Sequence, residues 1–152
     1  LFDTISVCLS KGLGAPIGSV LLADKETIHR ALRVRKILGG GMRQVGYLAA
    51  AGIYALENNI MRLTEDHRRA KELGLLLSRL PWVESVEPVE TNILIFKVIP
   101  SLSDALLIEK LRQKNIAISS LGKGKLRIVT QLVNREVMHT YVKETLQRLF
   151  VA

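Results

Sequence analysis

The sequence predicts a mixed α/β chain in two parts, with the end of a larger domain at residues 1–61 and a small α+β domain at residues 62–152. Three observations favour this reading. Short aliphatic segments alternate with amphipathic helical patterns along the chain. A helix near the middle is apolar on most of its faces, which is typical of a helix buried in a larger body. After Met61 the sequence changes to a regular order of strands and helices.

Composition sets the first limits. The chain has 152 residues, of which 48% are hydrophobic and 24% charged, so it is too apolar to be disordered. Its net charge of +8 fits either an anionic partner or a solvated surface. The single Cys8 excludes an internal disulfide framework and a multi-cysteine zinc site. The longest apolar run, residues 45–56, is shorter than the ~20 residues that span a bilayer, so no membrane partner is predicted.

The first part is expected to contain two strands and two helices. A turn rich in glycine and proline separates the strands, and Asp24 is a suitable N-cap for the first helix. The apolar face of that helix carries Ile28, Ala31 and Leu32, and three glycines end it. The predicted elements are strands at residues 4–9 and 17–23 and helices at residues 24–36 and 43–56.

The second part is expected to be a small sheet with helices packed on one face. Leu106, Leu107 and Leu111 are predicted to point inward from its middle helix, and Asn134 to cap the last one. The predicted elements are a helix at residues 62–80, strands at 83–86 and 92–98, a helix at 102–114, strands at 116–119 and 125–130, and a final helix after residue 134.

Lys11 is the main candidate for a catalytic residue. It stands at the end of an apolar strand, directly before the glycine-rich turn. A lysine that points from such a strand end into a cleft loses solvent, which makes a free amine available near neutral pH. That amine is the nucleophile that Schiff-base chemistry requires. A solvated lysine in a surface turn is the commoner alternative, and the local pattern leaves both open.

Two glycine-rich segments could bind an anion. The turn after Lys11 could cradle a phosphate through backbone N–H groups, although it lacks a complete nucleotide-binding spacing. Residues 39–41 are three glycines before Arg43, which could place backbone donors and a guanidinium against an anion. The alternative for this second segment is a flexible connector between two helices.

Arg127 is unusual because aliphatic residues flank it within a predicted strand. An arginine there either faces solvent or pairs with an anion, and its planar fork suits the carboxylate of an amino acid. His29, His67 and His139 share no metal-ligand spacing, so no metal site is predicted. We interpret all three histidines as surface or boundary residues.

Several motifs together resemble the low-specificity threonine aldolases, which are pyridoxal-phosphate enzymes of fold type I, the aspartate aminotransferase-like group. The first is Cys8-Leu-Ser-Lys-Gly-Leu-Gly-Ala-Pro-Ile-Gly-Ser19, followed by Arg35-Lys36 and by Gly39-Gly-Gly-Met-Arg-Gln44. Thr91-Asn92 and Leu126-Arg-Ile-Val-Thr130 are similar to the C-terminal domain of that family. The resemblance covers the whole chain, and the first motifs are specific in combination.

The resemblance implies a role for each candidate residue. Lys11 would hold pyridoxal 5'-phosphate covalently, and Lys36 and Arg43 would lie near its phosphate across a subunit interface. Arg127 would bind the substrate carboxylate. The implied reaction is retro-aldol cleavage of a β-hydroxy-α-amino acid, such as threonine or allo-threonine, to glycine and an aldehyde.

The resemblance also implies an organisation. Residues 1–61 would be the end of the large cofactor-binding domain, and residues 62–152 the small C-terminal domain. The protein would be a cytoplasmic homo-oligomer, a dimer or tetramer, with a small amino-acid substrate and no nucleic-acid or membrane partner. Because the general base and other cofactor contacts are expected before Leu1, we expect the chain to be a fragment that is inactive alone.

Three alternatives stay open. One is another fold type I enzyme, such as a β-eliminating lyase that acts on aromatic amino acids. Another is a nucleic-acid-binding α/β module, suggested by the basic face of residues 24–36, which however lacks interleaved aromatic residues. The third is a catalytically inactive relative that survives as an interaction partner.

Overall fold

The structure, a computed structural model, describes residues 1–150. The chain divides into two compact units, Leu1–Met61 and a second unit that begins at Arg62. Within residues 1–150 no helix is both long enough and apolar enough to cross a membrane. The two units are described separately.

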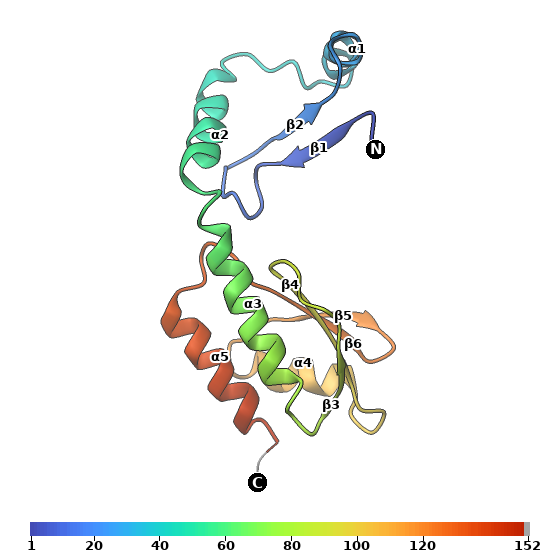
Figure 1. Ribbon diagram of the computed structural model, residues 1–152, viewed down its shortest axis with the longest axis vertical. Coiled ribbons are helices and arrows are strands. Elements are labelled where there is room, and N and C mark those ends of the chain that lie inside the picture. The colour runs from blue at the N-terminus through green and yellow to red at the C-terminus, as the bar shows by residue number, and fades with distance from the viewer. Residues whose placement is uncertain (151–152) are drawn as a thin grey trace. The chain divides into compact units, whose positions relative to one another are not determined.

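The first unit contains a two-stranded antiparallel sheet and two helices (Figure 1). Strand β1 (Ile5–Cys8) pairs with β2 (Ser19–Leu22). Helix α1 (Lys25–Ile37) begins after Asp24, whose carboxylate accepts the Thr27 N–H at 2.7 Å, so the predicted cap is confirmed. Helix α2 (Gly46–Asn58) follows.

Both helices of the first unit remain largely uncovered by it. The predicted apolar face of α1 is not packed, since no residue of this helix is buried. Helix α2 begins at Gly46 instead of the predicted residue 43, because Gln44 has a φ of 52° that a helix cannot contain. Only Gly52 and Ala55 of α2 are buried, and Tyr47 is 84% exposed. The burial of α2 in a larger body stays a prediction.

The second unit has the predicted order of strands and helices. Its elements are α3 (Leu63–Leu77), β3 (Val83–Val86), β4 (Ile93–Val98), α4 (Asp104–Arg112), β5 (Ser119–Gly122), β6 (Lys125–Val129) and α5 (Glu136–Arg148). The strands form one antiparallel sheet in the order β3-β4-β6-β5. The two central strands of this sheet, β4 and β6, therefore come from different strand pairs along the chain.

The core of the second unit lies on one face of the sheet, which the three helices cover (Figure 1). Alternate residues of β4, namely Leu94, Phe96 and Val98, are at most 2% exposed, as is Leu126 of β6. The rings of Trp82 and Phe96 pack in a T-shaped pair, with centroids 6.3 Å apart. The opposite face of the sheet is open to solvent, so the unit is a two-layer α+β structure.

Strand β5 begins three residues later than predicted. Residues 114–116 instead close the end of α4, where Ile116 N donates to Leu111 O at 2.9 Å. Asn115 has a φ of 58°, the left-handed conformation that a residue just beyond a helix often adopts. The apolar Ile116 that suggested a strand is a core residue, 9% exposed, at this helix end.

Three other predictions were wrong in detail. Leu106 is 48% exposed, because it lies about 100° around the helix from Leu107, which is fully buried. Asn134 does not cap α5; its side chain accepts the Gln131 N–H at 2.6 Å, and Arg135 is the N-cap residue. His139 is neither a surface nor a boundary residue, since it is 4% exposed and contacts Glu72 of α3.

Candidate functional site

Lys11 is the first residue of a tight turn between β1 and β2. The Gly14 N–H donates to the Lys11 carbonyl at 2.9 Å, and Gly14 has a φ of 73°. Below the turn, the Leu9 N–H donates to the Gly18 carbonyl at 2.9 Å, which extends the pairing of the two strands. The glycines thus allow the chain to reverse within a few residues. The turn presents Lys11 at its start, where the side chain is exposed.

Contacts with α2 hold this turn in place. Leu9 is 8% exposed, and its Cδ1 would lie 3.1 Å from a Cβ at Gly52, so the glycine allows close approach of strand and helix. The Asn59 side chain donates to the Leu13 carbonyl at 2.7 Å. The sequence around Asn59 gives no sign of this bond, because 46 positions separate it from Leu13. These contacts fix the backbone on both sides of Lys11.

The segment after α1 brings a cation against glycine backbone. A Cβ at Gly41 would lie 2.5 Å from Cδ of Lys36 and 3.3 Å from its Nζ. The Lys36 side chain therefore folds across the glycine segment, and a larger residue at position 41 would displace it. Gly39 has a φ of 83°, which lets the chain turn sharply after the helix. Arg43 follows on the surface of the same segment.

The three cations of the first unit are available to an external anion. Lys11, Lys36 and Arg43 are exposed, and none forms an ion pair with a carboxylate within residues 1–150. Lys11 is exposed in this unit, and its place in a cleft stays a prediction. Primary amine, ammonium and guanidinium groups beside glycine backbone are a donor set that fits an aldehyde cofactor bearing a phosphate.

Arg127 lies in the second unit, on the open face of the sheet. It sits in the middle of β6, opposite Ile95 of β4 and Ser119 of β5. Its side chain is exposed and makes no hydrogen bond or ion pair with a residue in the described range 1–150. The guanidinium is thus free to take a carboxylate. Arg127 belongs to the second unit, whereas Lys11, Lys36 and Arg43 belong to the first.

The comparisons with known proteins identify the family. The family model for beta-eliminating lyases matches residues 1–100 of the 152-residue chain. The chain belongs to that family.

Two curated relatives that the chain resembles are named low-specificity L-threonine aldolases. The chain is 44% identical over 135 residues to the low specificity L-threonine aldolase of Escherichia coli K12, covering 88% of this chain and 39% of that protein. It is 39% identical over 145 residues to low-specificity L-threonine aldolase 1 of Arabidopsis thaliana, covering 91% of this chain and 40% of that protein. The resemblance found in the motifs is therefore confirmed. The chain spans about two fifths of the length of these relatives.

A solved structure supports the fold. The structure from Listeria monocytogenes, assigned as an L-allo-threonine aldolase, superimposes with a TM-score of 0.74 at 16% identity, covering 98% of this chain and 45% of that one. The predicted α/β fold class, with its fold type I architecture, is confirmed. A likeness at this level of identity describes the fold and not the reaction.

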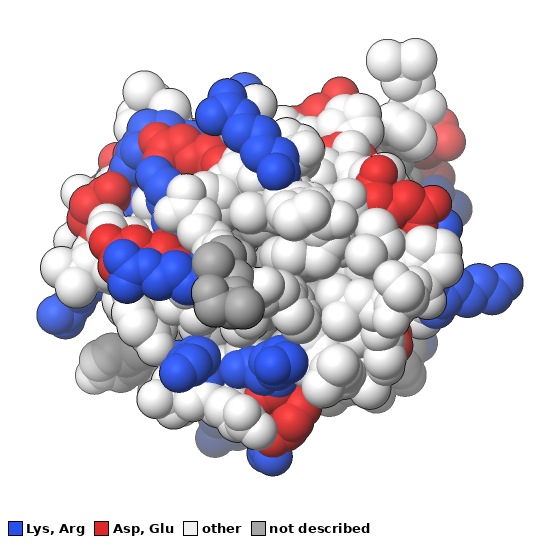
Figure 2. All heavy atoms as spheres, turned by 90° about the horizontal axis from the view of Figure 1, so that it is seen from below, with Lys and Arg blue, Asp and Glu red and all other residues white. Residues whose placement is uncertain are grey.

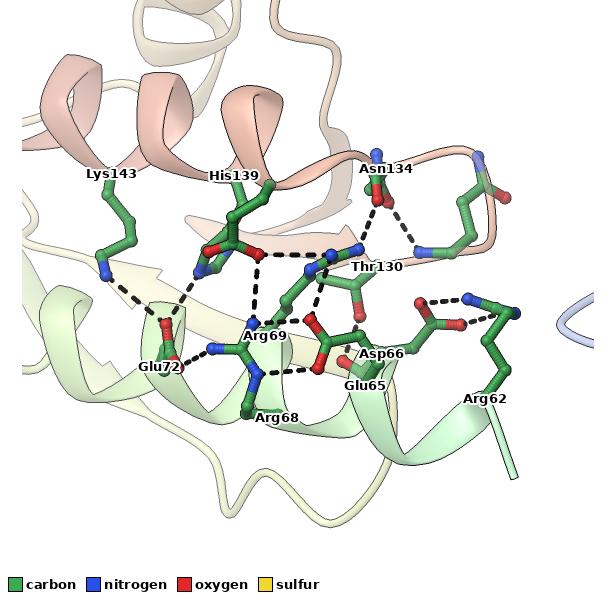
Figure 3. Close-up of polar contacts among 12 residues, drawn as sticks. Arg62, Glu65, Asp66, Arg68, Arg69, Glu72, Thr130, Asn134, His139 and Lys143 are labelled. Atoms are coloured by element: carbon green, nitrogen blue, oxygen red, sulfur yellow. Dashed lines mark hydrogen bonds and ion pairs between the residues drawn. The ribbon is translucent and has the colours of Figure 1, made fainter. Parts of the chain in front are cut away.

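The second unit contains a cluster of charged residues that the sequence did not predict. Figure 3 shows how these side chains join α3 to the start of α5. His139 Nε2 and Glu72 Oε2 are 2.9 Å apart, and Arg68 contacts Glu65 at 2.6 Å. The cluster comprises Glu65, Arg68, Arg69, Glu72, Glu136, His139 and Lys143. Spacings of three and four residues within α3 could have indicated its local pairs. The pairs between α3 and α5 have no such spacing, because their members lie far apart in the sequence.

We expect this cluster to make the free energy of unfolding depend on pH in the acidic range. The Arg68 guanidinium, by hydrogen bonding to Glu65, lowers the pKa of that carboxyl from 4.5 to about 2. A folded-state pKa below the unfolded one adds stability above pH 4.5, and that stability is lost as the pH falls toward about 2. Glu65→Gln should therefore flatten the fall in unfolding free energy across this pH range, measured by urea unfolding.

Glu144→Gln is the matched control, because Glu144 is an exposed carboxyl of the same unit without an ion pair in the part of the chain described. It should leave the pH dependence as in the wild type. Equal slopes for Glu65→Gln and the wild-type chain would contradict the assignment of this effect to Glu65.

Proposed function

We propose that the protein containing this chain is a pyridoxal-phosphate-dependent aldolase. It would cleave β-hydroxy-α-amino acids, such as threonine or allo-threonine, to glycine and an aldehyde. The observation that carries the proposal is the turn after β1, which fixes Lys11 as an unpaired exposed amine. That turn occurs in a chain 44% identical to a threonine aldolase.

Lys11 would hold the cofactor through a covalent bond from its amine. The turn suits this role, because the contacts of Leu9 and Leu13 with α2 fix the backbone while the side chain stays free. Lys36 and Arg43 would bind the cofactor phosphate, Lys36 beside the backbone of Gly41. When bound, pyridoxal phosphate supplies a ring that accepts the electron pair left at Cα as the Cα–Cβ bond breaks.

Arg127 would bind the carboxylate of the substrate. Two parallel N–H donors from one guanidinium fix both oxygens of a carboxylate and thereby orient the amino acid. Its position on an open sheet face, without a competing carboxylate in residues 1–150, supports this role. Orientation of the substrate decides which bond to Cα is broken, so Arg127 would act on specificity as well as on affinity.

The organisation of the whole protein is also proposed. We infer a cytoplasmic homo-oligomer, dimer or tetramer, in which residues 1–61 belong to the large cofactor-binding domain. The uncovered apolar surface of α2, with Tyr47 84% and Tyr54 64% exposed, supports further contacts for the first unit. A nucleic-acid partner is not proposed. On the face drawn in Figure 2, basic and acidic side chains are interspersed instead of forming a continuous basic patch.

The second candidate is β-elimination from an aromatic amino acid. The matching family model, which is that of beta-eliminating lyases, favours it. The two reactions share the lysine and the carboxylate-binding arginine and differ in their products. Threonine would give glycine and acetaldehyde in the first case and would not be cleaved between Cα and Cβ in the second.

Borohydride reduction of the full-length natural polypeptide, followed by peptide mapping and product analysis, tests the proposal. We expect a pyridoxyl-phosphate adduct on Lys11 and the release of glycine and acetaldehyde from threonine. An adduct without threonine cleavage would favour β-elimination over the aldolase reaction. The absence of any adduct would overturn both pyridoxal-phosphate proposals.

A further inference from the structure

Strand β6 loses part of its support directly after Arg127. On one side it pairs with β4 as far as Val129, which lies opposite Ile93. On the other side its pairing with β5 ends at Arg127, which lies opposite Ser119. Arg127 is therefore the last residue of β6 that neighbours hold on both sides. Something else must fix the end of this strand.

Thr130 supplies that support. Its N–H donates to the Asn92 carbonyl at 3.0 Å, and the Asn92 amide donates to the Thr130 carbonyl at 2.7 Å. Its hydroxyl donates to the backbone carbonyl of Asp66 at 2.6 Å. Thr130 is 5% exposed, so these bonds are shielded from water. One residue thus joins the end of β6 to the start of β4 and to α3.

The contact on α3 is firmly held. Asp66 is fully buried, and both its carboxylate oxygens accept from Arg62, at 2.7 and 3.1 Å (Figure 3). Ala70 and Leu73, on the following turns of α3, are also buried. The carbonyl that accepts the Thr130 hydroxyl is therefore part of a helix packed into the core. Thr130 connects β6 to a rigid element.

We propose that Thr130 is a positioning residue for Arg127. The two side chains point to opposite faces of the sheet, since the residues are three positions apart, and about 10 Å of extended chain lies between them. Thr130 acts through the backbone: it holds the strand end so that the guanidinium keeps one position on the open face. The inference rests on the proposed function, in which Arg127 binds the substrate carboxylate.

The test is Thr130→Val in the full-length natural polypeptide. Valine keeps the shape and removes the hydroxyl donor, so β6 should move more freely beyond Arg127. We expect KM for threonine to rise at least about fivefold, the size of one net hydrogen bond, with kcat within about twofold of wild type. Thr130→Ser, which keeps the donor, should stay close to wild type. Amide hydrogen exchange over residues 127–130, without substrate, should be faster in Thr130→Val than in wild type and unchanged in Thr130→Ser.

Asn92→Ala is a second variant that loosens the end of β6, because it removes the hydrogen bond from the Asn92 side-chain amide to the Thr130 carbonyl. It should raise KM in the same direction. Tyr141→Phe is the matched control. It deletes one side-chain hydrogen bond to backbone, from Tyr141 Oη to the Lys114 carbonyl at 3.0 Å, and neither residue belongs to β6. This control should leave KM and the exchange of residues 127–130 unchanged.

The outcomes separate the two proposals. Wild-type protein that neither forms the Lys11 adduct nor cleaves threonine would defeat the proposed function, while the exchange measurement would still decide whether Thr130 holds β6. An active wild type with unchanged KM in both Thr130→Val and Asn92→Ala would overturn the positioning role. Equal effects of Thr130→Ser and Thr130→Val would overturn it too, since the hydroxyl would then not be the cause.

Discussion

Lys11→Arg is expected to abolish threonine cleavage, with a loss of at least about a thousandfold in kcat, the scale seen when a covalent catalytic group is removed. Arginine keeps the positive charge and much of the length of lysine. Its guanidinium stays protonated at every accessible pH, so it cannot form the covalent bond that Lys11 would make with the cofactor aldehyde. The substitution therefore removes the nucleophile and keeps the positive charge, so it tests the role of the nucleophile alone.

The measurement combines kcat on threonine with peptide mapping after borohydride reduction of the full-length polypeptide. Lys25→Arg is the matched control, because Lys25 is an exposed lysine of the same unit, at the first position of α1 and outside the proposed site. It should keep both activity and the adduct. An adduct on another lysine in Lys11→Arg, together with retained activity, would show that the nucleophile had been assigned wrongly.

Local sequence chemistry was sufficient to predict the turn that begins at Lys11. The pairing of glycines with a proline after a short apolar strand indicated a tight turn, and the turn is present with Gly14 at positive φ. Asp24 is found as the predicted cap, because capping depends on residues within one turn of the helix. The strand and helix order after Met61 was likewise encoded in short-range hydrophobic periodicity.

Contacts between distant residues could not be predicted in this way. Thr130 meets Asp66 across 64 positions of sequence, and nothing near either residue indicates the other. The prediction that His139 is a surface or boundary residue rests on local sequence alone, whereas Glu72 of another helix lies against it. The Asn59 bond to the Leu13 carbonyl, which steadies the Lys11 turn, is of the same kind.

Predictions made from one helix or strand at a time also misplaced two element ends. Ile116 was assigned to a strand because it is apolar and precedes alternating residues. The helix end at Asn115 decides its place instead, since the turn that closes α4 draws the following apolar side chain into the core. The prediction that Asn134 caps the helix rests on residue type alone, whereas its side chain accepts the Gln131 N–H and so closes the turn before the helix.

Arg127→Met is expected to raise KM for threonine by up to about a hundredfold, because hydrogen bonds to a charged group contribute about 1.5–3 kcal/mol and each 1.4 kcal/mol is tenfold. Methionine fills similar space without donors, so the sheet should stay folded while the carboxylate loses its partner. The value of kcat should fall less than kcat/KM, since the cofactor and Lys11 are untouched. Steady-state kinetics with threonine measure both constants.

Lys125→Met is the matched control for Arg127→Met. Lys125 stands two residues earlier on β6, which places it on the same face of the sheet, and it pairs with Glu87 at 2.8 Å. Loss of this cation should leave KM unchanged. A second control uses 1-amino-2-propanol, which lacks the carboxylate, as an inhibitor; its inhibition constant should be the same for wild type and Arg127→Met. If Arg127→Met weakened both ligands equally, the guanidinium would be acting on the site as a whole, and its assignment to the carboxylate would be wrong.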